Sequence, residues 1–334
     1  MSSWYEPIEP VNAVAVSTRI RLARNIKGIP FPSKMTLEQF DKVNNLVRDA
    51  MAQSDLPIAK RLKYISMENV PEIERFAMVE RHIISKNFAS NYQNRAIIIS
   101  DDERICIMLG EEDHIRIQVL LEGLQFEKAY EIAETIDSIL CNALDIAYDN
   151  RIGFLTECPT NLGTGLRASA MLHLPMLEDR GELRSLTESI SKLGLTVRGM
   201  YGEGTKALAS LYQISNQVTL GISEKNAIDN LKIITNQLID REKEYRKQLN
   251  TLKIEDRCMR SYGILKNARI LTSAELLSRA SDILLGVSLG VVKCGIWPMK
   301  LIVEGQPYML MKKVGEMPPD SRDIERATMI RNLL

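Results

Sequence analysis

Five arginines in this sequence stand beside apolar residues or glycines rather than within charged surface runs. They are Arg19, Arg21, Arg116, Arg167 and Arg198. A guanidinium group stays charged and can bind phosphate oxygens through two parallel hydrogen bonds. A triphosphate needs several such donors together with a magnesium ion. Each arginine taken alone is more simply explained by solvation or a salt bridge, so the hypothesis of a phosphate clamp depends on all five together.

A second chemical feature is the segment of residues 157–169, which combines a cysteine, a proline, two glycines and an arginine. A short apolar run, residues 152–155, leads into it, and another, residues 168–177, follows. We expect a strand, then a small-residue loop with accessible amide groups, then a helix that starts at Arg167. Such an arrangement binds anions at the helix N-terminus.

The elements that must position these arginines are mostly strands. Residues 17–21 alternate in polarity, so Arg19 and Arg21 point to one face if this segment is a strand. Arg116 begins a predicted strand, and Arg198 lies near the end of another. Three short apolar runs are joined by links too short for a parallel crossover, which favours antiparallel hairpins. They are residues 96–100, 104–109 and 115–121.

The remaining pattern is largely helical. Thr36 and Gln39 form a capping box for an amphipathic helix over residues 36–53. Other expected elements are helices over residues 127–148, 182–193, 223–249, 272–285 and from 318 onward, and strands over residues 195–200 and 208–220. The fold class is therefore α+β. An antiparallel sheet flanked by helices is expected over residues 12–240, and a mainly helical C-terminal domain over residues 241–334.

Composition limits the function classes. The chain has 334 residues, enough for two domains with separate cores, and its 43 basic residues balance its 43 acidic ones. With no net charge, the chain has no overall electrostatic attraction to nucleic acid or to an acidic membrane. The five scattered cysteines favour a reducing cytoplasm over a disulfide framework. We expect no structural metal site, no signal peptide, and no spanning helix, since no apolar run approaches ~18 residues.

Residues 157–169 resemble the signature of the phosphagen (guanidino) kinases, which move a phosphoryl group from ATP to a guanidinium nitrogen. The resemblance implies a guanidino-kinase catalytic domain with ATP lying on the sheet and Mg²⁺ held mainly through phosphates and water. It also implies a set of nucleotide-binding residues. They are Ser17, Thr18, Arg19, Ile20, Arg21, His82, Arg116, Arg167, Ala168, Ser169, Ala170, Met171, Arg198, Gly199, Met200, Tyr201, Gly202 and Glu203. For His82, an ordinary core or surface histidine remains the alternative, and His114 and His173 are expected to be structural.

The resemblance also implies the groups that hold the acceptor. Glu112 and Glu203 match the two catalytic carboxylates of the family, and Cys158 matches its active-site cysteine, expected to be a thiolate that positions the guanidinium. A buried, inert cysteine is the alternative for Cys158. Gly110 stands where the family motif usually has asparagine. Full removal of a guanidinium proton by a carboxylate would span ~8 pKa units, or about 11 kcal/mol. The carboxylates are therefore expected to align the acceptor, with the proton leaving late.

The C-terminal segment resembles the bacterial protein arginine kinases within this superfamily. Their Arg-Asp-x-x-Arg-Ala motif, a regulatory phosphoarginine receptor, is matched here by six consecutive residues. They are Arg322, Asp323, Ile324, Glu325, Arg326 and Ala327. Arg322 and Arg326 are four apart and would share a helix face. Metabolic guanidino kinases carry a helical domain before the first arginine motif, which here begins at Ser17, so an open acceptor site that admits a protein-bound arginine is expected.

This resemblance implies protein substrates with accessible arginines, a Clp-type protease that degrades the marked proteins, a heat-shock repressor among the targets, an activator protein and a homodimer. Two alternatives remain open: a non-catalytic phosphoarginine-binding adaptor and a kinase of free arginine. A dinucleotide-binding loop at Gly163, Gly165 and Ala168 is disfavoured, because no strand ending in an acid follows about 20 residues later. The P-loop and the motifs of hydroxyl-directed protein kinases are absent from the sequence.

Overall fold

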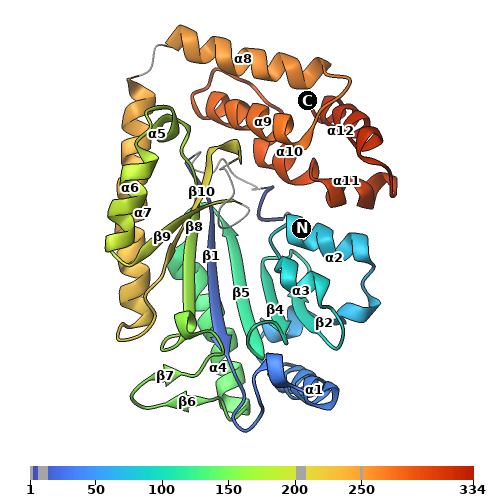
Figure 1. The fold of residues 1–334 in the computed structure, drawn as a ribbon, viewed down its shortest axis with the longest axis vertical. Coiled ribbons are helices and arrows are strands. Elements are labelled where there is room, and N and C mark those ends of the chain that lie inside the picture. The colour runs from blue at the N-terminus through green and yellow to red at the C-terminus, as the bar shows by residue number, and fades with distance from the viewer. Residues whose placement is uncertain (1–2, 7–13, 201–207, 249–250) are drawn as a thin grey trace.

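A computed structural model describes residues 3–6, 14–200, 208–248 and 251–334. Its centre is an eight-stranded sheet in the order β2-β3-β4-β5-β1-β8-β10-β9 (Figure 1). Every pairing between neighbouring strands is antiparallel. The strands are β1 (Ala15–Arg24), β2 (Leu62–Ser66), β3 (Ala96–Ser100), β4 (Ile105–Leu109), β5 (Ile115–Glu122), β8 (Leu166–His173), β9 (Leu195–Gly199) and β10 (Leu211–Asn216). The predicted α+β fold with an antiparallel sheet is confirmed.

One face of the sheet is apolar and covered by helices. The strand residues on this face include Ile20 and Leu22 of β1 and Ile117 and Val119 of β5, all fully or almost fully buried. Because β-strand side chains alternate between faces, the intervening residues must point the other way. The covering helices are α1 (Leu37–Gln53), α4 (Phe126–Ala143), α6 (Leu183–Lys192) and α7 (Glu224–Lys247). The capping box predicted at Thr36 and Gln39 is present at the start of α1.

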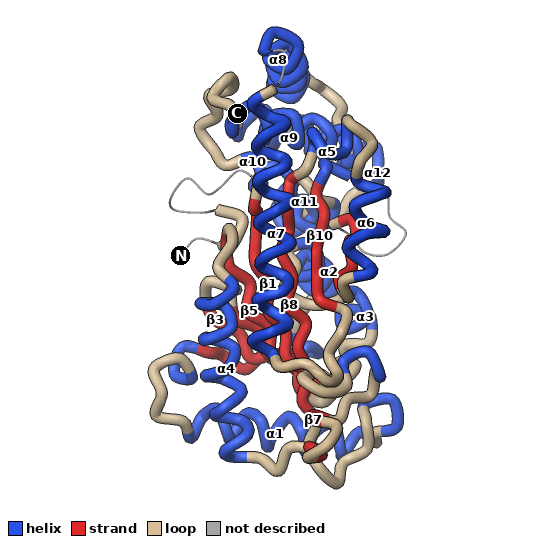
Figure 2. The backbone as a smooth tube through the Cα atoms, turned by 90° about the vertical axis from the view of Figure 1, so that its left-hand side faces the viewer, coloured by secondary structure: helices blue, strands red, loops and turns tan. Residues whose placement is uncertain are grey.

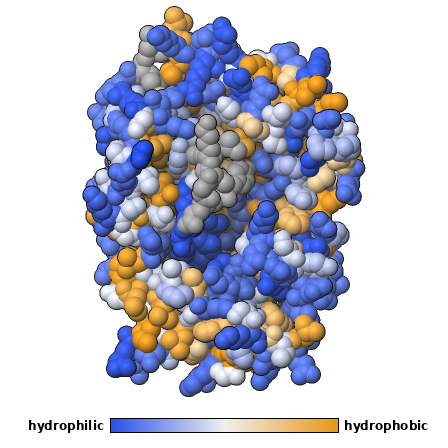
Figure 3. Space-filling view, viewed as in Figure 1, coloured by the Kyte–Doolittle hydropathy of each residue, from blue (hydrophilic) through white to orange (hydrophobic). Residues whose placement is uncertain are grey.

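The opposite face is divided into two halves. Over β3 and β4 it is apolar, and it packs under α2 (Glu72–Glu80) and α3 (Lys86–Ser90) through residues such as Phe88, Ile97 and Met108. Over β5, β1, β8, β10 and β9 the side chains on this face are mostly polar. In the space-filling view, hydrophilic residues gather just below the middle of the molecule (Figure 3). The polar half of this face therefore remains available to a ligand.

The C-terminal segment forms five helices at one end of the sheet (Figures 1 and 2). They are α8 (Thr251–Asn267), α9 (Ser273–Ser288), α10 (Pro298–Glu304), α11 (Pro307–Val314) and α12 (Pro319–Leu333). Their apolar cluster includes Leu120 of β5, Met171 of β8 and Leu211 of β10, together with Trp4 and Tyr5. The helical segment thus shares part of its core with the sheet, unlike the separate cores expected from length alone.

Three expected elements differ from the structure. Residues 168–177 do not form one helix: β8 runs to His173, and the short α5 (Pro175–Asp179) follows. The helix expected to reach residue 148 ends at Ala143, because Leu144 is extended and Ile146 then forms an isolated bridge with Ile26, two residues after β1. The strand expected over residues 208–220 is confined to β10.

Two smaller features complete the fold. The apolar run at residues 152–155 supplies only β7 (Gly153–Phe154), which pairs with β6 (Tyr148–Asp149) in a small separate hairpin. Short 3-10 turns are η1 (Pro32–Lys34), η2 (Ala59–Arg61), η3 (Met67–Asn69), η4 (Pro159–Asn161) and η5 (Leu208–Ser210). Within the described ranges, no helix is long and apolar enough to cross a membrane.

Candidate active site

The sheet register brings the predicted arginines onto one face. Arg21 of β1 lies directly opposite Arg167 of β8, and Arg116 of β5 lies opposite Ala23 of β1. Directly opposed residues in an antiparallel sheet point to the same side. Arg198 of β9 is brought to this face through its pairing with Gln213 of β10. The alternation predicted for residues 17–21 is confirmed, and all five arginines lie on the polar half of the sheet.

These arginines repel one another in partly buried surroundings. Burial, followed by the charges of Arg116 and Arg167, lowers the pKa of Arg19 to about 10. Burial and the neighbouring arginines lower the pKa of Arg21 further, and Glu111 only partly opposes this. The Nε of Arg21 is buried and has no hydrogen-bond partner within the described part of the chain. Such a cluster suits a multiply charged anion, because phosphate oxygens would supply the missing acceptors and negative charge.

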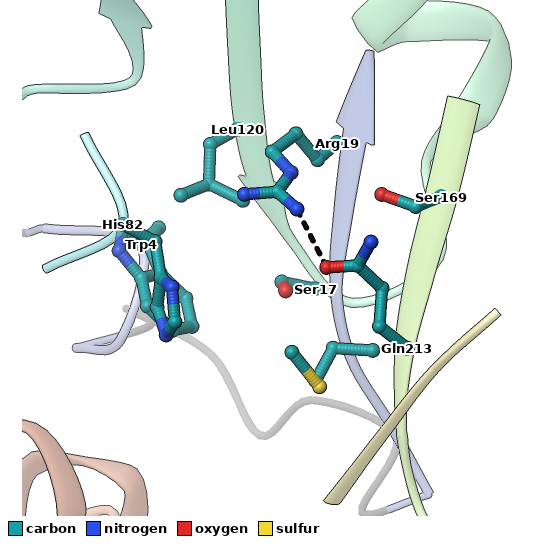
Figure 4. A pocket seen from close by; sticks show the side chains of 8 residues that line it. Trp4, Ser17, Arg19, His82, Leu120, Ser169 and Gln213 are labelled. Carbon is teal, nitrogen blue, oxygen red and sulfur yellow. Dashed lines mark hydrogen bonds between the residues drawn. The ribbon is translucent and has the colours of Figure 1, made fainter. Parts of the chain in front are cut away.

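Residues of β10 hold two of the guanidinium groups. Arg19 donates from Nη2 to Gln213 Oε1 at 2.5 Å, and Arg167 donates to the hydroxyl of Ser215 at 3.5 Å. Figure 4 shows the bond between Arg19 and Gln213 at the side of a small cavity. Sequence reasoning did not identify Gln213 or Ser215, since a strand pattern does not reveal which strands become neighbours.

His82 lies at the same cavity as Arg19. It follows α2 with a positive φ of 60°, and Gln118 Nε2 donates to its carbonyl oxygen at 2.9 Å. Burial and then the charge of Arg19 lower the pKa of the imidazole to about 3. The ring is therefore neutral at physiological pH. It can stack against or hydrogen-bond a ligand but adds no charge to the arginine cluster.

The other expected nucleotide-binding residues fall into four groups. Ser17, Ser169 and Met171 line the cavity beside His82. Thr18, Ile20, Ala168 and Ala170 belong to the opposite face of the sheet and are fully buried, so they contribute only backbone to the arginine face. Gly199 ends β9, and Met200 packs in the C-terminal apolar cluster. Tyr201, Gly202 and Glu203 lie outside the described residues.

The turn between β4 and β5 presents Glu111 and Glu112 beside Arg116. The Arg116 guanidinium contacts Glu111 at 2.5 Å and Glu112 at 3.0 Å. Burial raises the pKa of Glu111, but Arg116 and a hydrogen bond from Ser85 outweigh it and leave that pKa below its usual value. The side chain of Glu111 is 5% exposed, whereas that of Glu112 is 39% exposed. Glu111 therefore fixes Arg116, and Glu112 is the carboxylate that a second ligand can reach.

Cys158 lies with Glu112 in one open depression. This depression has a volume of about 480 Å³, and its lining includes Glu111, Glu112, Glu157, Cys158 and Arg95. Cys158 is half-buried, and its sulfur lies 3.0 Å from the hydroxyl of Thr160. Three carboxylates and a thiol in one depression form a suitable cradle for a cationic guanidinium group.

Asp113, which sequence reasoning did not identify, ties the two acceptor segments together. Its Oδ1 accepts from Asn25 Nδ2 at 2.7 Å and from the backbone N–H of Glu157 at 2.8 Å. Burial raises the pKa of this carboxyl, against these hydrogen bonds. The carboxylate therefore joins the turn that carries Glu112 to the segment that carries Cys158.

The glycine loop does not have the expected role. Arg167 lies on β8 and not at the start of a helix, so the predicted helix-terminus anion site is wrong. Gly163 has a φ of 106°, and a Cβ there would lie 2.3 Å from the carbonyl oxygen of Thr219. A Cβ at Gly165 would lie 2.6 Å from the carbonyl oxygen of Ala23. These glycines are required by close backbone packing, and Arg167 reaches the site from the sheet.

The C-terminal motif lies on α12, and Arg326 is occupied by internal acceptors. This residue is 1% exposed. It donates to the carbonyl oxygens of Gly305 at 2.7 Å and Leu271 at 2.8 Å, and it pairs with Asp323. Arg322 is partly exposed, Ile324 is 48% exposed, Glu325 is partly exposed, and Ala327 is buried. Arg326 thus anchors α12 to two neighbouring loops, while Arg322 is the arginine of this motif that solvent reaches.

Comparisons with known proteins identify two segments of the chain. Residues 42–245 match the model described as "ATP:guanido phosphotransferase, C-terminal catalytic domain", and residues 251–334 match the "Protein-arginine kinase McsB C-terminal domain". A curated relative from Desulforamulus reducens, named protein-arginine kinase, is 46% identical over 341 residues, covering 100% of this chain and 95% of the relative. A protein of the same name from Caldanaerobacter subterraneus subsp. tengcongensis is 42% identical, covering 96% of this chain and 97% of that protein.

Solved structures show the same fold. A crystal structure of lombricine kinase is 25% identical with a TM-score of 0.61, covering 70% of this chain and 68% of that one. The duplicated taurocyamine kinase from Schistosoma mansoni with bound transition-state-analogue components is also 25% identical, with a TM-score of 0.62, covering 78% of this chain and 40% of that one. By the family models, the full-length relatives and the shared fold, this chain belongs to the protein-arginine kinases of the ATP:guanido phosphotransferase family.

Proposed function

We propose that this chain is an ATP-dependent protein kinase that phosphorylates arginine side chains of proteins on a guanidinium nitrogen. The observation that carries the proposal is that five arginines on one sheet face lie beside a depression that holds Glu112 and Cys158. Arg116 belongs to both parts, because it lies on the arginine face and contacts Glu112. An anionic donor and a cationic acceptor can therefore meet at Arg116.

The arginines bind the triphosphate and stabilise the charge on the transferred phosphoryl group. Arg19 and Arg21 approach from β1, Arg167 from β8 and Arg198 from β9, so the sheet holds the four side chains in place before the nucleotide arrives. Preorganised donors of this kind supply much of the catalysis in phosphoryl transfer. The magnesium ion bound with ATP neutralises phosphate charge. Within the described part of the chain, no cluster of three or more His, Cys, Asp or Glu side chains could hold it, so we propose that it enters on the phosphates.

The acceptor residues align the guanidinium group. Glu112, with Glu203 as the second proposed carboxylate, holds the planar cation so that one nitrogen lies in line with the γ-phosphorus. A nitrogen–phosphorus bond forms as the bond from the γ-phosphorus to its bridging oxygen breaks, and ADP departs. The nitrogen proton leaves late, when bonding to phosphorus has removed its basicity. Cys158 positions the guanidinium group and forms no covalent bond to the substrate.

A protein-bound arginine suits this site better than free arginine. The depression beside Glu112 and Cys158 is open to solvent, and its lining comes from loops and short helices around the sheet edge. An extended polypeptide can therefore place an arginine side chain into the depression while its backbone stays outside.

The proposal extends to the domains, the regulation and the partners of the chain. We propose a catalytic domain over residues 12–240 and a helical domain over residues 241–334, with the motif of residues 322–327 as a phosphoarginine receptor. Phosphoarginine would mark proteins for a Clp-type protease and relieve a heat-shock repressor in the cytoplasm, with an activator protein and a homodimer built through the C-terminal helices. These roles rest on the relatedness to protein-arginine kinases. Arg322→Ala is the variant that tests the receptor, because Arg326 also supports the fold.

The deciding assay supplies Mg²⁺ and ATP labelled on the γ-phosphate to an unfolded arginine-rich protein, in parallel with free arginine. We expect acid-labile label on the protein and none on free arginine. Label on free arginine would identify a metabolic guanidino kinase. Phosphoarginine binding without any transfer, with activator supplied, would identify a non-catalytic adaptor and overturn the proposal.

A further inference from the structure

Trp4 lies in the cavity where the proposed nucleotide residues meet. Its side chain is 2% exposed. The centroid of its ring is 5.7 Å from that of His82, and the two planes are inclined by 58°. Figure 4 shows Trp4 and His82 together at one side of the cavity, with Arg19 and Gln213 at the other. A side chain from the start of the chain therefore occupies one end of the arginine face.

The space left beside Trp4 is too small for a nucleotide base. The cavity lined by Trp4, His82, Arg19 and Met171 has a volume of about 10 Å³. That volume is near the minimum needed for a single water molecule. A purine ring is many times larger. A base can therefore enter this end of the site only if one wall of the cavity moves.

Among these walls, Trp4 is the one whose displacement leaves the sheet and the helices intact. Leu120 and Met171 belong to central strands, and the backbone of His82 is held by Gln118 of β5. Trp4 instead belongs to a short turn, closed by a bond of 2.9 Å from the N–H of Glu6 to the carbonyl oxygen of Ser3. Displacing this turn breaks no sheet or helix.

The contacts of the turn connect it to two parts of the described chain. The indole Nε1 donates to the carbonyl oxygen of Arg81 at 2.8 Å. Glu6 forms an ion pair with Lys300 of α10. Trp4 and Tyr5 also pack with the apolar cluster of the C-terminal helices. The turn is therefore fastened both to α2, just before His82, and to the C-terminal segment.

We propose that the turn of residues 3–6 is an autoinhibitory plug: Trp4 fills the base end of the nucleotide site, and nucleotide binds only after Trp4 leaves. This inference rests on the proposed function, because it takes the arginine face as the nucleotide site. When a ligand binds only a minor conformation, its apparent affinity is the intrinsic affinity multiplied by the fraction of molecules in that conformation. The plug therefore weakens the apparent affinity for nucleotide. The size of this effect depends on the ion pair between Glu6 and Lys300 of α10, because that contact stabilises the plugged conformation.

The first test measures the affinity for a non-hydrolysable Mg²⁺–ATP analogue by calorimetry in full-length variants. If Trp4 fills the cavity in about nine molecules of ten, Trp4→Ala binds about tenfold more tightly than the parent chain. Glu6→Gln loosens the anchor without altering the cavity and should give a smaller gain in the same direction. Trp297→Phe changes the only other tryptophan of the chain and should leave the affinity unchanged.

The second test uses Trp4 emission in the Trp297→Phe background. We expect buried, blue-shifted emission without ligand and a red shift as the analogue saturates. Weaker binding by Trp4→Ala would overturn the plug and make Trp4 a stacking wall. Equal binding in all variants with unchanged emission would also overturn it, while the nucleotide site would stand. If no variant binds the analogue, Trp4→Ala included, both the plug and the proposed function fail.

Discussion

Arg21 and Arg24 lie three residues apart on β1, and their surroundings are opposite. Arg24 is 1% exposed, and it donates to the two carboxylate oxygens of Asp137 at 2.9 and 2.7 Å. Its guanidinium carbon also lies 3.4 Å from the centroid of the Phe154 ring. Arg21 faces three other arginines, and its Nε is buried without a hydrogen-bond partner in the described ranges.

The difference separates a structural charge from a ligand-binding one. A buried arginine with internal acceptors stabilises the fold as long as the set stays intact, and losing one member leaves a costly unpaired charge. Buried arginines that face each other cost stability until an anion arrives. Arg326, with its two carbonyl acceptors and Asp323, belongs with Arg24. Sequence motifs alone place Arg21 and Arg326 in the same class, and the structure separates them.

The largest expected effect on stability comes from replacing the buried arginines that have internal acceptors. Arg24→Ala leaves Asp137 without its main partner and should lower the free energy of unfolding by about 3–5 kcal/mol. Arg326→Ala should cost a similar amount, because it frees two buried carbonyl groups and Asp323. Urea denaturation followed by circular dichroism measures both losses. An unchanged unfolding midpoint in either variant would contradict the structural role.

The next effect concerns the two carboxylates that share Arg116. Glu112→Gln should lower kcat about 100-fold or more, because misplacing a reacting group by about 1 Å costs on that order. The affinity for ATP and the unfolding midpoint should stay close to those of the parent chain. Glu111→Gln is the matched variant and should instead destabilise the fold, since Glu111 is buried. Near-normal turnover by Glu112→Gln would remove Glu112 from the acceptor site.

Removing an unsatisfied arginine should weaken binding without weakening the fold. Arg21→Met should lower the affinity for Mg²⁺–ATP about 10- to 100-fold, corresponding to one or two charge-assisted hydrogen bonds. Its stability without ligand should equal or exceed that of the parent chain, because like-charge repulsion is relieved. Calorimetry and thermal unfolding with and without nucleotide separate the two quantities. A large loss of stability without ligand would place Arg21 in the same class as Arg24.

The smallest expected effect is a pH dependence of stability, which comes from a buried carboxyl group and not from an arginine. Burial raises the pKa of Glu80 to about 7, against hydrogen bonds from the backbone amides of Tyr308 and Met309. A carboxyl whose pKa is higher in the folded state contributes stability at low pH and loses it as pH rises through the folded value. Between pH 4.5 and 7 the chain should therefore lose about 3 kcal/mol of stability through this group. Glu80→Gln should flatten that dependence in urea titrations across pH, and an identical slope would exclude Glu80.

Much of the fold follows from local pattern. The alternation at residues 17–21 predicts a strand with Arg19 and Arg21 on one face, and the short links after residues 100 and 109 predict antiparallel hairpins. The run at residues 168–177 misled the prediction, because a buried strand and a buried helix are equally apolar and periodicity does not separate them.

The missing parts of the site depend on contacts between distant segments. Gln213 meets Arg19 across 194 residues of sequence, and Asp113 joins Asn25 to Glu157. Trp4 reaches Arg81 across 77 residues from a turn without regular structure. No local pattern encodes such pairings. Strand pairing decides which polar residues become neighbours, and only the folded chain shows it.

The apolar cluster shared by the sheet and the C-terminal helices has an evolutionary consequence. Leu120, Met171 and Leu211 pack among helices that follow residue 251. A substitution that enlarges or shrinks one of these side chains must be matched in the helices, and the reverse also holds. The two segments are therefore expected to diverge together within a lineage, and chimaeras that exchange the C-terminal segment between distant relatives should assemble poorly even when each catalytic residue is retained.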